Sequence, residues 1–456
     1  MNIELPHVLR CSDKTVYLVG GSVRDLIRGA APTDYDVVVF GDPRAYAERL
    51  AGQIKTRVIE LGTDRHTVYH LVSGKISIDI TAAKGPDIEQ DLIQRDFTIN
   101  AMACSLADGR VVDVTTGLAD LSGGMVRMIS PAVFQEDPVR LIRAYRMAAT
   151  LGFRIDAETA GAIARRAALI RQSAGERVWS ELRQILTTPG SHDQISAMAR
   201  SSLLIAILPQ LAQLKGCQQN RHHAHDVLDH TLQALTALEA IIEDPAPHFT
   251  AQAVHCIEEM DAGTGAILKL ALLLHDVGKP DSRTVDASGR AHFYGHAKQS
   301  ALLAQVIGRR LTLSNQDRGL LHFLVLYHQR PLSLFLSANR DFGRLPPKAL
   351  GRFLRQSGSR TPLLLLHALA DHLGKGVASD GMAAFIKLLM TAYFERMHPP
   401  RMPLLNGNEL MEAFGLSPSP LIGELLRRVE QAGLAGTIRD RKEAMAWVAD
   451  FLIKNR

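Results

Sequence analysis

The sequence predicts a mixed α/β domain at the N-terminus and an all-α body behind it. Within residues 15–80, three short runs rich in β-branched residues alternate with two helical segments, which is typical of a mixed sheet with helices. Beyond about residue 130 the strand signals fade and helical periodicity continues. Most of the 18 histidines fall after residue 220, which sets that region apart. We therefore expect four parts, at residues 1–125, 126–210, 211–375 and 376–456.

The elements of these parts follow from short runs and the residues that bound them. Strands are predicted at 15–21, 35–40 and 75–80, because each run is β-branched and bounded by Gly, Pro or Asp. In the third run, isoleucines alternate with polar residues, so Asp79 faces away from the apolar side. Helices are predicted at 23–29, 42–54 and 136–153, and a polar loop at 281–290 interrupts the later helices.

Composition narrows the class of protein. No apolar run approaches the ~18–20 residues that a bilayer crossing needs, and the first residues lack the apolar core of a signal peptide. The four cysteines are scattered without a CxxC pair, which disfavours a zinc or disulfide framework. We expect a soluble cytoplasmic protein with no membrane partner. The formal charge of +5 weakly supports a nucleic-acid partner.

A glycine turn followed by paired carboxylates is the most informative motif. Gly20 and Gly21 precede Arg24, and a glycine turn with an arginine suits a triphosphate. Asp34 and Asp36 are spaced i, i+2 on a predicted strand, so both point to the same face. Convergent carboxylates form a hard oxygen site suited to Mg²⁺. The motif therefore predicts a nucleotide held beside one or two metal ions, ready for transfer of its α-phosphoryl group.

Two further blocks support this interpretation, since an isolated Asp-x-Asp is common. The first, RDFTINAMA, spans residues 95–103, and the second, EDPVRLIRAYR, spans 136–146. If the second block is helical, Asp137, Arg140 and Arg143 lie at i, i+3 and i+6 on one face. Residues 126–200 also hold eleven arginines and no lysine against seven acids, which fits phosphate or base contacts and an ordinary solvated surface equally well.

With these blocks the chain resembles the class II tRNA nucleotidyltransferase and bacterial poly(A) polymerase family of the DNA-polymerase-β nucleotidyltransferase superfamily. The resemblance rests on GGSVRD, DYD, RDFTINAMA and EDPVRLIRAYR in this order, and it covers residues 16–190. It implies a polymerase-β-type catalytic head at 1–125 and a helical neck at 126–210 that binds nucleobase and RNA. It also implies template-independent addition of CCA, or part of it, to the tRNA 3′ end from CTP and ATP by two-metal phosphoryl transfer, with no role for DNA.

The resemblance implies a role for each matching residue. Asp34 and Asp36 would hold Mg²⁺, and Asp79 is the candidate third carboxylate, with a plain surface acid as the alternative. An arginine donor and an aspartate acceptor can match base edges without a template. Contacts to the triphosphate, ribose and base are expected from Gly21, Arg24, Arg95, Asp96, Asn100, Asp137, Arg140 and Arg143.

One departure leaves the product open. His70 stands where many members of the family have an arginine, at the end of a divergent stretch, 61–70. In the family this region carries a flexible loop linked to the switch from C to A addition. The chain could therefore add CCA, CC, a single A or a poly(A) tail. Bacterial poly(A) polymerases usually carry a basic C-terminal extension in place of a histidine-rich domain, which disfavours that alternative.

The histidine-rich part, 211–375, has a second set of candidate ligands. His230, then His275-Asp276 in the run HDVGKP, then a distant Asp371 resemble the ligand order of HD-type metal phosphohydrolases. The resemblance implies a site for a divalent transition metal such as Mn²⁺, Ni²⁺, Co²⁺ or Fe²⁺, and also Mg²⁺. Such domains can keep the fold and lose the chemistry, so phosphoester hydrolysis stays one of two alternatives. Candidates for a second metal or a phosphate are His296 and His328.

The remaining predictions concern rival functions and the C-terminal tail. A phosphohydrolase whose N-terminal half only binds RNA is the second alternative, and the intact Asp34, Asp36, Arg24 and Arg140 argue against it. The tail at 376–456, which includes a proline-rich linker at 399–403, is expected to pack and to contact the tRNA elbow. Surface or RNA-facing positions are expected for His222, His223 and His225.

Overall fold

The computed structural model describes residues 3, 9, 11–63, 66–217, 226–288, 290–376, 381–397, 404–434, 438 and 440–454. The predictions for His222, His223, His225 and the linker at 399–403 lie outside these residues. The chain divides into two compact units, Met1–Ile386 and Lys387–Arg456. Within the described ranges, no helix combines the length and the apolar character that crossing a membrane requires.

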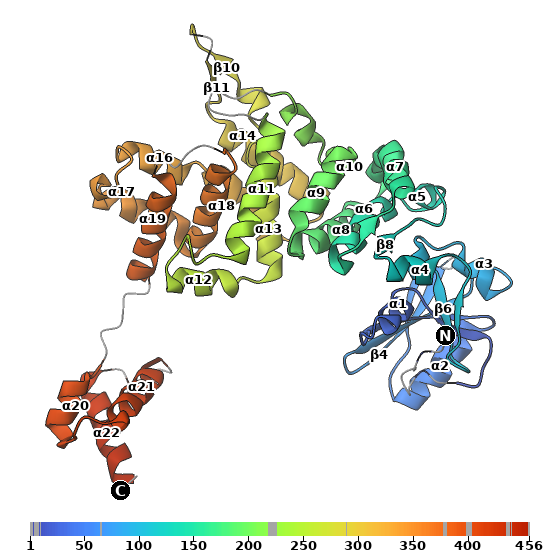
Figure 1. Cartoon of the computed structure of the whole chain (residues 1–456), viewed down its shortest axis with the longest axis horizontal. Coiled ribbons are helices and arrows are strands. Elements are labelled where there is room, and N and C mark those ends of the chain that lie inside the picture. The colour runs from blue at the N-terminus through green and yellow to red at the C-terminus, as the bar shows by residue number, and fades with distance from the viewer. Residues whose placement is uncertain are drawn as a thin grey trace. The chain divides into compact units, whose positions relative to one another are not determined.

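A seven-stranded mixed sheet forms the N-terminal head (Figure 1). Its strand order is β3-β4-β5-β2-β1-β6-β7, in which β2 and β5 run parallel and the other neighbours pair antiparallel. The predicted mixed sheet is confirmed, and its three predicted strands are β1, β2 and β5. The strands are β1 (Val16–Val19), β2 (Asp34–Val39), β3 (Ile59–Thr63), β4 (His66–Ser73), β5 (Ile76–Ala82), β6 (Met102–Ser105) and β7 (Val111–Asp113).

Local sequence explains where the head helices begin. Gly20 has φ of 74°, a conformation that costs glycine little, and it turns the chain from β1 into α1. The Asp42 side chain accepts hydrogen bonds from two first-turn N–H groups of α2, and Pro43 occupies the first helical position. Helix α1 packs against β1, β2 and β6, and α2 packs against β2, β4 and β5. The head helices are α1 (Gly21–Ile27), α2 (Pro43–Ile54), α3 (Ile88–Leu92) and α4 (Gly117–Ser122).

Amphipathic helices form the neck that follows the head. In α6, Leu141, Ala144, Tyr145 and Ala148 are buried at i, i+3, i+4 and i+7, so one stripe faces the core. Two short strands, β8 (Met125–Val126) and β9 (Arg154–Ile155), pair in parallel beside these helices. The neck helices are α5 (Val133–Glu136), α6 (Arg140–Leu151), α7 (Ala157–Arg166), α8 (Gly175–Thr187), α9 (Ser191–Arg200) and α10 (Leu203–Ile207).

The helix predicted at 136–153 begins later than expected. Asp137 has φ of −143° and ψ of 95°, which is extended backbone, and α6 starts only at Arg140. The physical reason is Pro138, because the residue before a proline is disfavoured in the α region. The prediction that Asp137 shares a helix face with Arg140 and Arg143 is therefore wrong, although the three residues remain close in the chain.

The histidine-rich part is built around α13, which is buried continuously from Gly265 to Leu274. Helix α13 contacts α8, α11, α14, α15 and α18, so it lies among the other helices of this part (Figure 1). The loop predicted at 281–290 contains β10 (Thr284–Val285), which pairs antiparallel with β11 (Ala291–His292) just after the loop. The helices of this part are α11 (Val227–Glu243), α12 (Ala251–Glu258), α13 (Ala262–Leu274), α14 (His296–Arg310), α15 (Asn315–Tyr327), α16 (Arg330–Ser337), α17 (Pro347–Ser357) and α18 (Thr361–Leu373). Helix α19 (Met382–Met397) follows beyond residue 375.

Short 3₁₀ turns connect several of these helices. One of them follows Arg95 and Asp96 in the head and shapes the segment that carries Asn100. The turns are η2 (Thr98–Asn100), η3 (Ala167–Gln172), η4 (Pro209–Leu214), η5 (Pro280–Ser282), η6 (Phe342–Arg344) and η7 (Gly358–Arg360).

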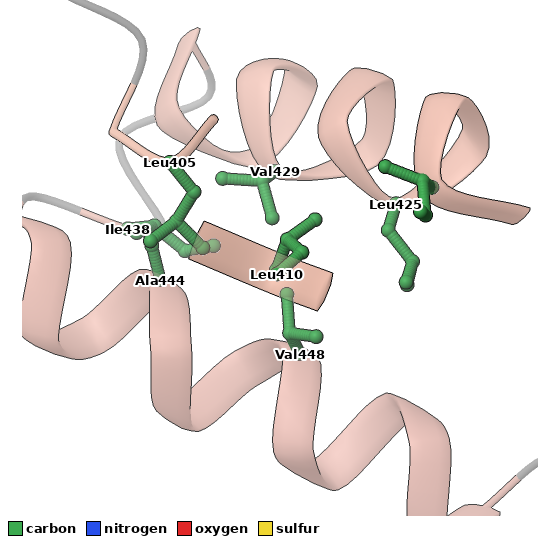
Figure 2. Packing of buried hydrophobic residues seen from close by; sticks show 8 residues of the cluster. Leu405, Leu410, Leu425, Val429, Ile438, Ala444 and Val448 are labelled. Atoms are coloured by element: carbon green, nitrogen blue, oxygen red, sulfur yellow. The ribbon is translucent and has the colours of Figure 1, made fainter. Parts of the chain in front are cut away.

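The C-terminal tail has an apolar core of its own (Figure 2). Its helices are α20 (Gly407–Phe414), α21 (Pro420–Leu434) and α22 (Arg441–Lys454). A capping box starts α20, in which Asn406 and Glu409 satisfy each other's backbone N–H groups. The side chains labelled in Figure 2 point toward one another from all three helices and from the segments beside them. The buried residues of this core are Leu405, Leu410, Ile422, Leu425, Val429, Ile438, Ala444 and Val448.

Candidate active site

Three candidate carboxylates lie on two adjacent parallel strands of the head. Asp34 and Asp36 of β2 pair in register with Ser77 and Asp79 of β5. Because paired residues of adjacent strands point to the same side, all three carboxylates share one face of the sheet. The Ser77 hydroxyl donates a hydrogen bond to Asp34, which orients that carboxylate. The structure therefore brings together the carboxylates that the sequence singled out.

The Asp36 carboxylate lies beside the glycine turn. A Cβ at Gly20 would stand 3.1 Å from Asp36 Oδ2 and 3.4 Å from Arg95 Nη1, so a glycine keeps this approach open. Burial raises the pKa of Asp36; Arg95 opposes the rise, and the charges of Asp79 and Asp34 add to it. A hard divalent cation would stabilise the charged form of a buried carboxylate that has other carboxylates beside it. The donor set therefore fits Mg²⁺.

Asp79 has a partner that the sequence showed only as a departure from the family pattern. His70 of β4 pairs in register with Asp79 of β5, and its Nδ1 lies 2.6 Å from Asp79 Oδ1. This contact holds the third carboxylate on the same face as Asp36. The divergent stretch before His70 forms the paired strands β3 and β4, and residues 64–65 between them lie outside the described part.

Two guanidinium groups near the turn are oriented by neighbouring side chains. Arg24 donates one hydrogen bond to Asn100 Oδ1 at 2.8 Å and two to the carboxylate of Asp25. Arg95 donates two hydrogen bonds, of 2.7 and 3.0 Å, to the buried Asp91. Charge-assisted, paired bonds of this kind fix a guanidinium in one geometry. Both arginines are thus preorganised beside the carboxylates.

A network of charged residues connects the head to the neck. Arg143 donates to Asp96 Oδ2 at 3.1 Å and to Glu181 Oε1 at 2.9 Å, and Arg146 donates to Glu181 Oε2 at 2.5 Å. Asn100 completes the network by donating to Asp96 Oδ1 at 3.1 Å. Burial lowers the pKa of Arg143, but the two carboxylates outweigh burial and raise it. Arg143 is therefore a fixed, permanently charged donor.

Asp137 reaches the same region through a residue that the sequence interpretation did not single out. Arg177 of α8 donates to Asp137 Oδ2 at 2.7 Å. Burial raises the pKa of Asp137, but Arg177 outweighs burial and the pKa is lowered. Arg177 and Glu181 are spaced i, i+4 on α8, so both lie on the helix face that meets Asp137 and the arginines of α6. This spacing is the feature of the sequence that could have pointed to Arg177 and Glu181 as residues of the site. Arg140 donates to Glu136 at 3.1 Å.

These residues surround a cleft of about 770 Å³. Its size is within the range typical of sites for small ligands. Arg24, Asp34 and Asp137 stand outside the wall, although Arg24 is bonded to a wall residue, Asn100. The predicted residues on the wall are Gly21, Asp36, Asp79, Arg95, Asp96, Asn100, Arg140 and Arg143.

The predicted ligands of the second site also converge. His230 Nε2 lies 2.9 Å from Asp371 Oδ1, although the two residues are 141 positions apart. His275 Nε2 lies 3.5 Å from the same oxygen and 3.1 Å from Asp276 Oδ2. His230, His275 and Asp276 offer ligand atoms that lie within 4.8 Å of one another and are buried. The geometry fits a metal ion held by these residues.

A second group shares Asp276 with the first. Asp276 Oδ1 lies 3.2 Å from His296 Nε2 and 3.9 Å from His328 Nε2. In His275, His296 and His328, Nδ1 lies 2.7 Å from the carbonyl of the residue three positions earlier. These carbonyls accept the Nδ1 proton, so Nε2 of each ring is the nitrogen that can bind a metal ion once it carries no proton, as in metal-ligating histidines. The two groups form one His–Asp centre: His230, His275, Asp276, His296, His328 and Asp371.

Lysines and a buried proton compensate the charge of the His–Asp centre. Lys279 lies 2.6 Å from Asp276 Oδ2, and Lys375 lies 3.1 Å from Asp371 Oδ2. Burial raises the pKa of both carboxyls, but His275 and the lysines outweigh it and hold the pKa far below its usual range. Burial lowers the pKa of His275, but the two carboxylates raise it to about 10. Binding of a divalent ion would release this proton.

His367 lies in the same cluster and was not predicted. Its ring centroid is 5.5 Å from that of His275 and 5.9 Å from that of His328. The residue is 0% exposed, and neither ring nitrogen has a hydrogen-bond partner among the described residues. Burial, reinforced by His275, lowers its pKa to about 3, so the ring is neutral. The spacing of His367 to Asp371, i and i+4 on α18, was the signal that could have found it.

Comparison with known proteins identifies the family. Residues 16–127 match the family described as "Poly A polymerase head domain". Residues 152–215 match the family described as "probable RNA and SrmB-binding site of polymerase A". The chain is 32% identical over 443 residues to the A-adding tRNA nucleotidyltransferase of Deinococcus radiodurans, with 94% of each chain covered. The chain belongs to the tRNA nucleotidyltransferase family.

Other similarities agree with this tRNA nucleotidyltransferase assignment. The chain is 31% identical over 445 residues to the CC-adding tRNA nucleotidyltransferase of Thermus thermophilus, covering 95% of this chain and 93% of that one. The fold resembles that of the CCA-adding enzyme of Thermotoga maritima complexed with tRNA, with a TM-score of 0.59 at 22% identity, covering 96% of this chain and 91% of that one. The predicted family, the α/β head with its helical body and the nucleotidyltransferase class are confirmed.

Three groups of predictions are not tested by these similarities. Members of the family generally use a divalent metal such as Mg²⁺, and the metal at each site of this chain stays a prediction. The roles of the individual site residues and the domain boundaries stay predictions. The same holds for an HD-type phosphohydrolase domain at 211–375.

Proposed function

We propose that the protein is a cytoplasmic enzyme that adds CCA, or part of it, to the 3′ end of tRNA from CTP and ATP. The observation that carries the proposal is the cleft, on which Asp36 and Asp79 of the head and Arg140 and Arg143 of the neck lie together. Carboxylates that can hold metal ions and arginines that can contact a nucleotide are the two requirements of nucleotidyl transfer. The names of the relatives, A-adding and CC-adding tRNA nucleotidyltransferase, support tRNA as the acceptor.

Different residues of the head would bind the metal ions and the triphosphate during phosphoryl transfer. Asp34 and Asp36 would hold Mg²⁺, which supplies activation of the primer 3′-hydroxyl and neutralisation of the triphosphate when it is bound. The glycine turn at Gly20 gives the triphosphate access to the backbone, and Arg95 offers it positive charge. The 3′-oxygen then forms a bond to the α-phosphorus while the bond to pyrophosphate breaks. Asp79 is available on the same face as the third carboxylate.

The residues of the neck would read the base. Arg143 is held by Asp96 and Glu181, and Asp137 is held by Arg177. A fixed arginine donates hydrogen bonds and a fixed carboxylate accepts them, so the pair can discriminate base edges without a template. A preorganised pair also avoids the entropy cost of ordering long side chains when the nucleotide binds.

The decisive experiment supplies tRNAs that end at the discriminator base, at C or at CC. CTP and ATP are given separately and together, and products are resolved to one nucleotide. CC followed by A indicates a CCA-adding enzyme, CC alone or A alone indicates a partial enzyme, and a long A tail indicates a poly(A) polymerase. Absence of incorporation on all three acceptors would overturn the proposal and favour an RNA-binding head.

Site variants connect the activity to the cleft. Asp36→Ala should abolish incorporation on every acceptor, because it removes one of the paired carboxylates. Glu48→Ala is the matched control, since Glu48 is an exposed carboxylate of α2 in the same head, paired with Arg44. Incorporation by Asp36→Ala at the rate of the control would contradict the assigned site.

A second function, metal-dependent phosphoester hydrolysis, is favoured by the His–Asp centre. Two groups of buried ligand atoms that share Asp276 could hold metal ions and so activate water. The test measures the bound metal and then hydrolysis of a phosphomonoester and a cyclic phosphodiester with Mn²⁺, Ni²⁺ or Mg²⁺. Asp276→Asn should abolish hydrolysis and leave nucleotidyl transfer unchanged. A metal-free protein without hydrolysis under these conditions would contradict this function.

A further inference from the structure

We propose that His367 is a metal ligand of the His–Asp centre, and that the centre therefore takes a transition-metal ion in preference to Mg²⁺. This inference rests on the second proposed function, metal binding by the His–Asp centre. It adds a ligand that neither the motif order nor the comparisons contain, and it commits to the class of metal.

The unpaired nitrogens of His367 are the first observation. A buried polar group without a partner is destabilising, so a helical core would be more stable with leucine at this position. Its neighbours on α18 are indeed buried leucines, among them Leu366 and Leu369. The backbone of Ala271, on α13, approaches the ring as a hydrogen-bond partner of marginal geometry, which leaves the other ring nitrogen without one. A bound ion would satisfy the remaining nitrogen.

Ring spacing is the second observation. Within the two groups of the centre, the centroids of His230 and His275 are 5.7 Å apart, and those of His296 and His328 are 5.3 Å apart. His367 lies 5.5 Å from His275 and 5.9 Å from His328 by the same measure. It therefore contacts one histidine of each group at the distance that the predicted ligands keep from each other.

Helix geometry is the third observation. His367 and Asp371 are spaced i, i+4 on α18, which places both side chains on one face of the helix. Two ligands at this spacing can bind one ion, as the two histidines of the HExxH motif do. Asp371 already lies 2.9 Å from His230 and 3.5 Å from His275, so the face of α18 that carries His367 is turned to the centre.

The donor set then decides the class of metal. With His367 the centre holds five imidazoles, of His230, His275, His296, His328 and His367, and two carboxylates. Imidazole nitrogen suits transition metals such as Mn²⁺, Fe²⁺, Co²⁺, Ni²⁺ and Zn²⁺, whereas Mg²⁺ prefers oxygen. The head offers carboxylates, so one chain would bind two different metals at two sites.

The test measures metal in the purified full-length protein by mass spectrometry after dialysis against excess Mg²⁺. We expect the wild type to retain a transition metal, and His367→Ala to lower the affinity for Co²⁺ at least about tenfold, a loss that even outer-shell partners can cause. The visible absorption of the Co²⁺ form should also change, because a nitrogen ligand is lost. His367→Gln keeps a buried polar side chain of similar length, so it serves as the second variant if the alanine variant does not fold. It should show the same loss of Co²⁺ affinity. The matched control is His255→Ala, since His255 is exposed on α12.

The outcomes separate this inference from the proposed function beneath it. A wild type that retains no transition metal overturns both metal binding by the centre and the role of His367. A wild type that retains the metal, with unchanged Co²⁺ affinity and spectrum in both His367 variants, overturns only the role of His367. Retention of Mg²⁺ in place of a transition metal overturns the inferred metal class.

Discussion

Substitution of Glu181 by glutamine tests whether the neck network positions the base-reading arginine. Glu181 is 9% exposed at its side chain and accepts hydrogen bonds from Arg143 at 2.9 Å and from Arg146 at 2.5 Å. Glutamine has the same shape and keeps one oxygen that can accept a hydrogen bond from one of the two arginines. Its NH₂ group would face the other guanidinium, and because both groups are donors no hydrogen bond could form there. Arg143 would keep a single carboxylate partner, Asp96, at 3.1 Å.

The expected magnitude follows from these contacts. Losing one charge-assisted hydrogen bond costs about 1.5–3 kcal/mol, and the other arginine loses its charged partner as well, so we expect unfolding of the neck to become easier by about 2–4 kcal/mol. A shift of ~1 Å in a positioning residue can cost ~100-fold in rate. We therefore expect kcat/KM for nucleotide addition to fall about 10–100-fold, with a higher frequency of wrong nucleotides.

The assay combines steady-state addition to tRNA, with CTP and ATP in turn, and chemical denaturation followed by circular dichroism. Glu176→Gln is the control, because Glu176 is exposed on the same helix, and its effect on stability should be within about 0.5 kcal/mol. A Glu181→Gln enzyme with the control's kcat/KM, fidelity and denaturation midpoint would refute the positioning role of Glu181.

Two further predictions concern the head, and a third concerns Glu239 of α11 in the histidine-rich part. Asp34→Ala should lower incorporation by orders of magnitude with an unchanged melting temperature, and near-normal incorporation would contradict its metal-binding role. Gly20→Ala places a Cβ 3.1 Å from Asp36 Oδ2 at φ of 74°. The kcat/KM should therefore fall, and the free energy of unfolding should drop by about 1–2 kcal/mol. A variant with the kcat/KM and the stability of the wild type would contradict the close approach. Burial raises the pKa of Glu239, but the hydrogen bond from Lys269 outweighs burial and lowers the pKa below the ordinary 4.5. The ionised Glu239 therefore stabilises the fold above pH 4.5, and this stabilisation is lost as the pH falls through the pKa of the folded state. Glu239→Gln should flatten the acid-side slope of the unfolding free energy and destabilise the protein by about 3–5 kcal/mol at neutral pH, and an unchanged slope would show that Glu239 is not responsible.

The head illustrates what local sequence can predict. The strands β1, β2 and β5 and the helices α1 and α2 appear where short β-branched runs and capping residues place them. The pairing of Asp34 and Asp36 on one face follows from the two-residue period of a strand. Such features depend on neighbours in the chain, so they can be deduced without knowledge of the rest of the fold.

Contacts between elements could not be deduced in this way. The register of β4 against β5 brings His70 to Asp79, and the packing of α8 against α6 brings Arg177 to Asp137 and Glu181 to Arg143. The i, i+4 spacing of Arg177 and Glu181 places them on one face of α8, but no period or motif indicates which residues that face contacts. Pro138 shows the opposite case, in which a local signal was present but was outweighed in the prediction by the helical pattern around it.

By itself the sequence determined the reaction class of this tRNA nucleotidyltransferase and the order of its parts. The motifs that carry this information are short segments, and their chemistry depends on residue type and spacing. Only the tertiary structure decided which side chains hold the motif residues in place and that the ring of His367 lies beside those of His275 and His328. Those neighbours come from helices and strands far apart in the chain, and their approach is set by packing, which no local pattern encodes.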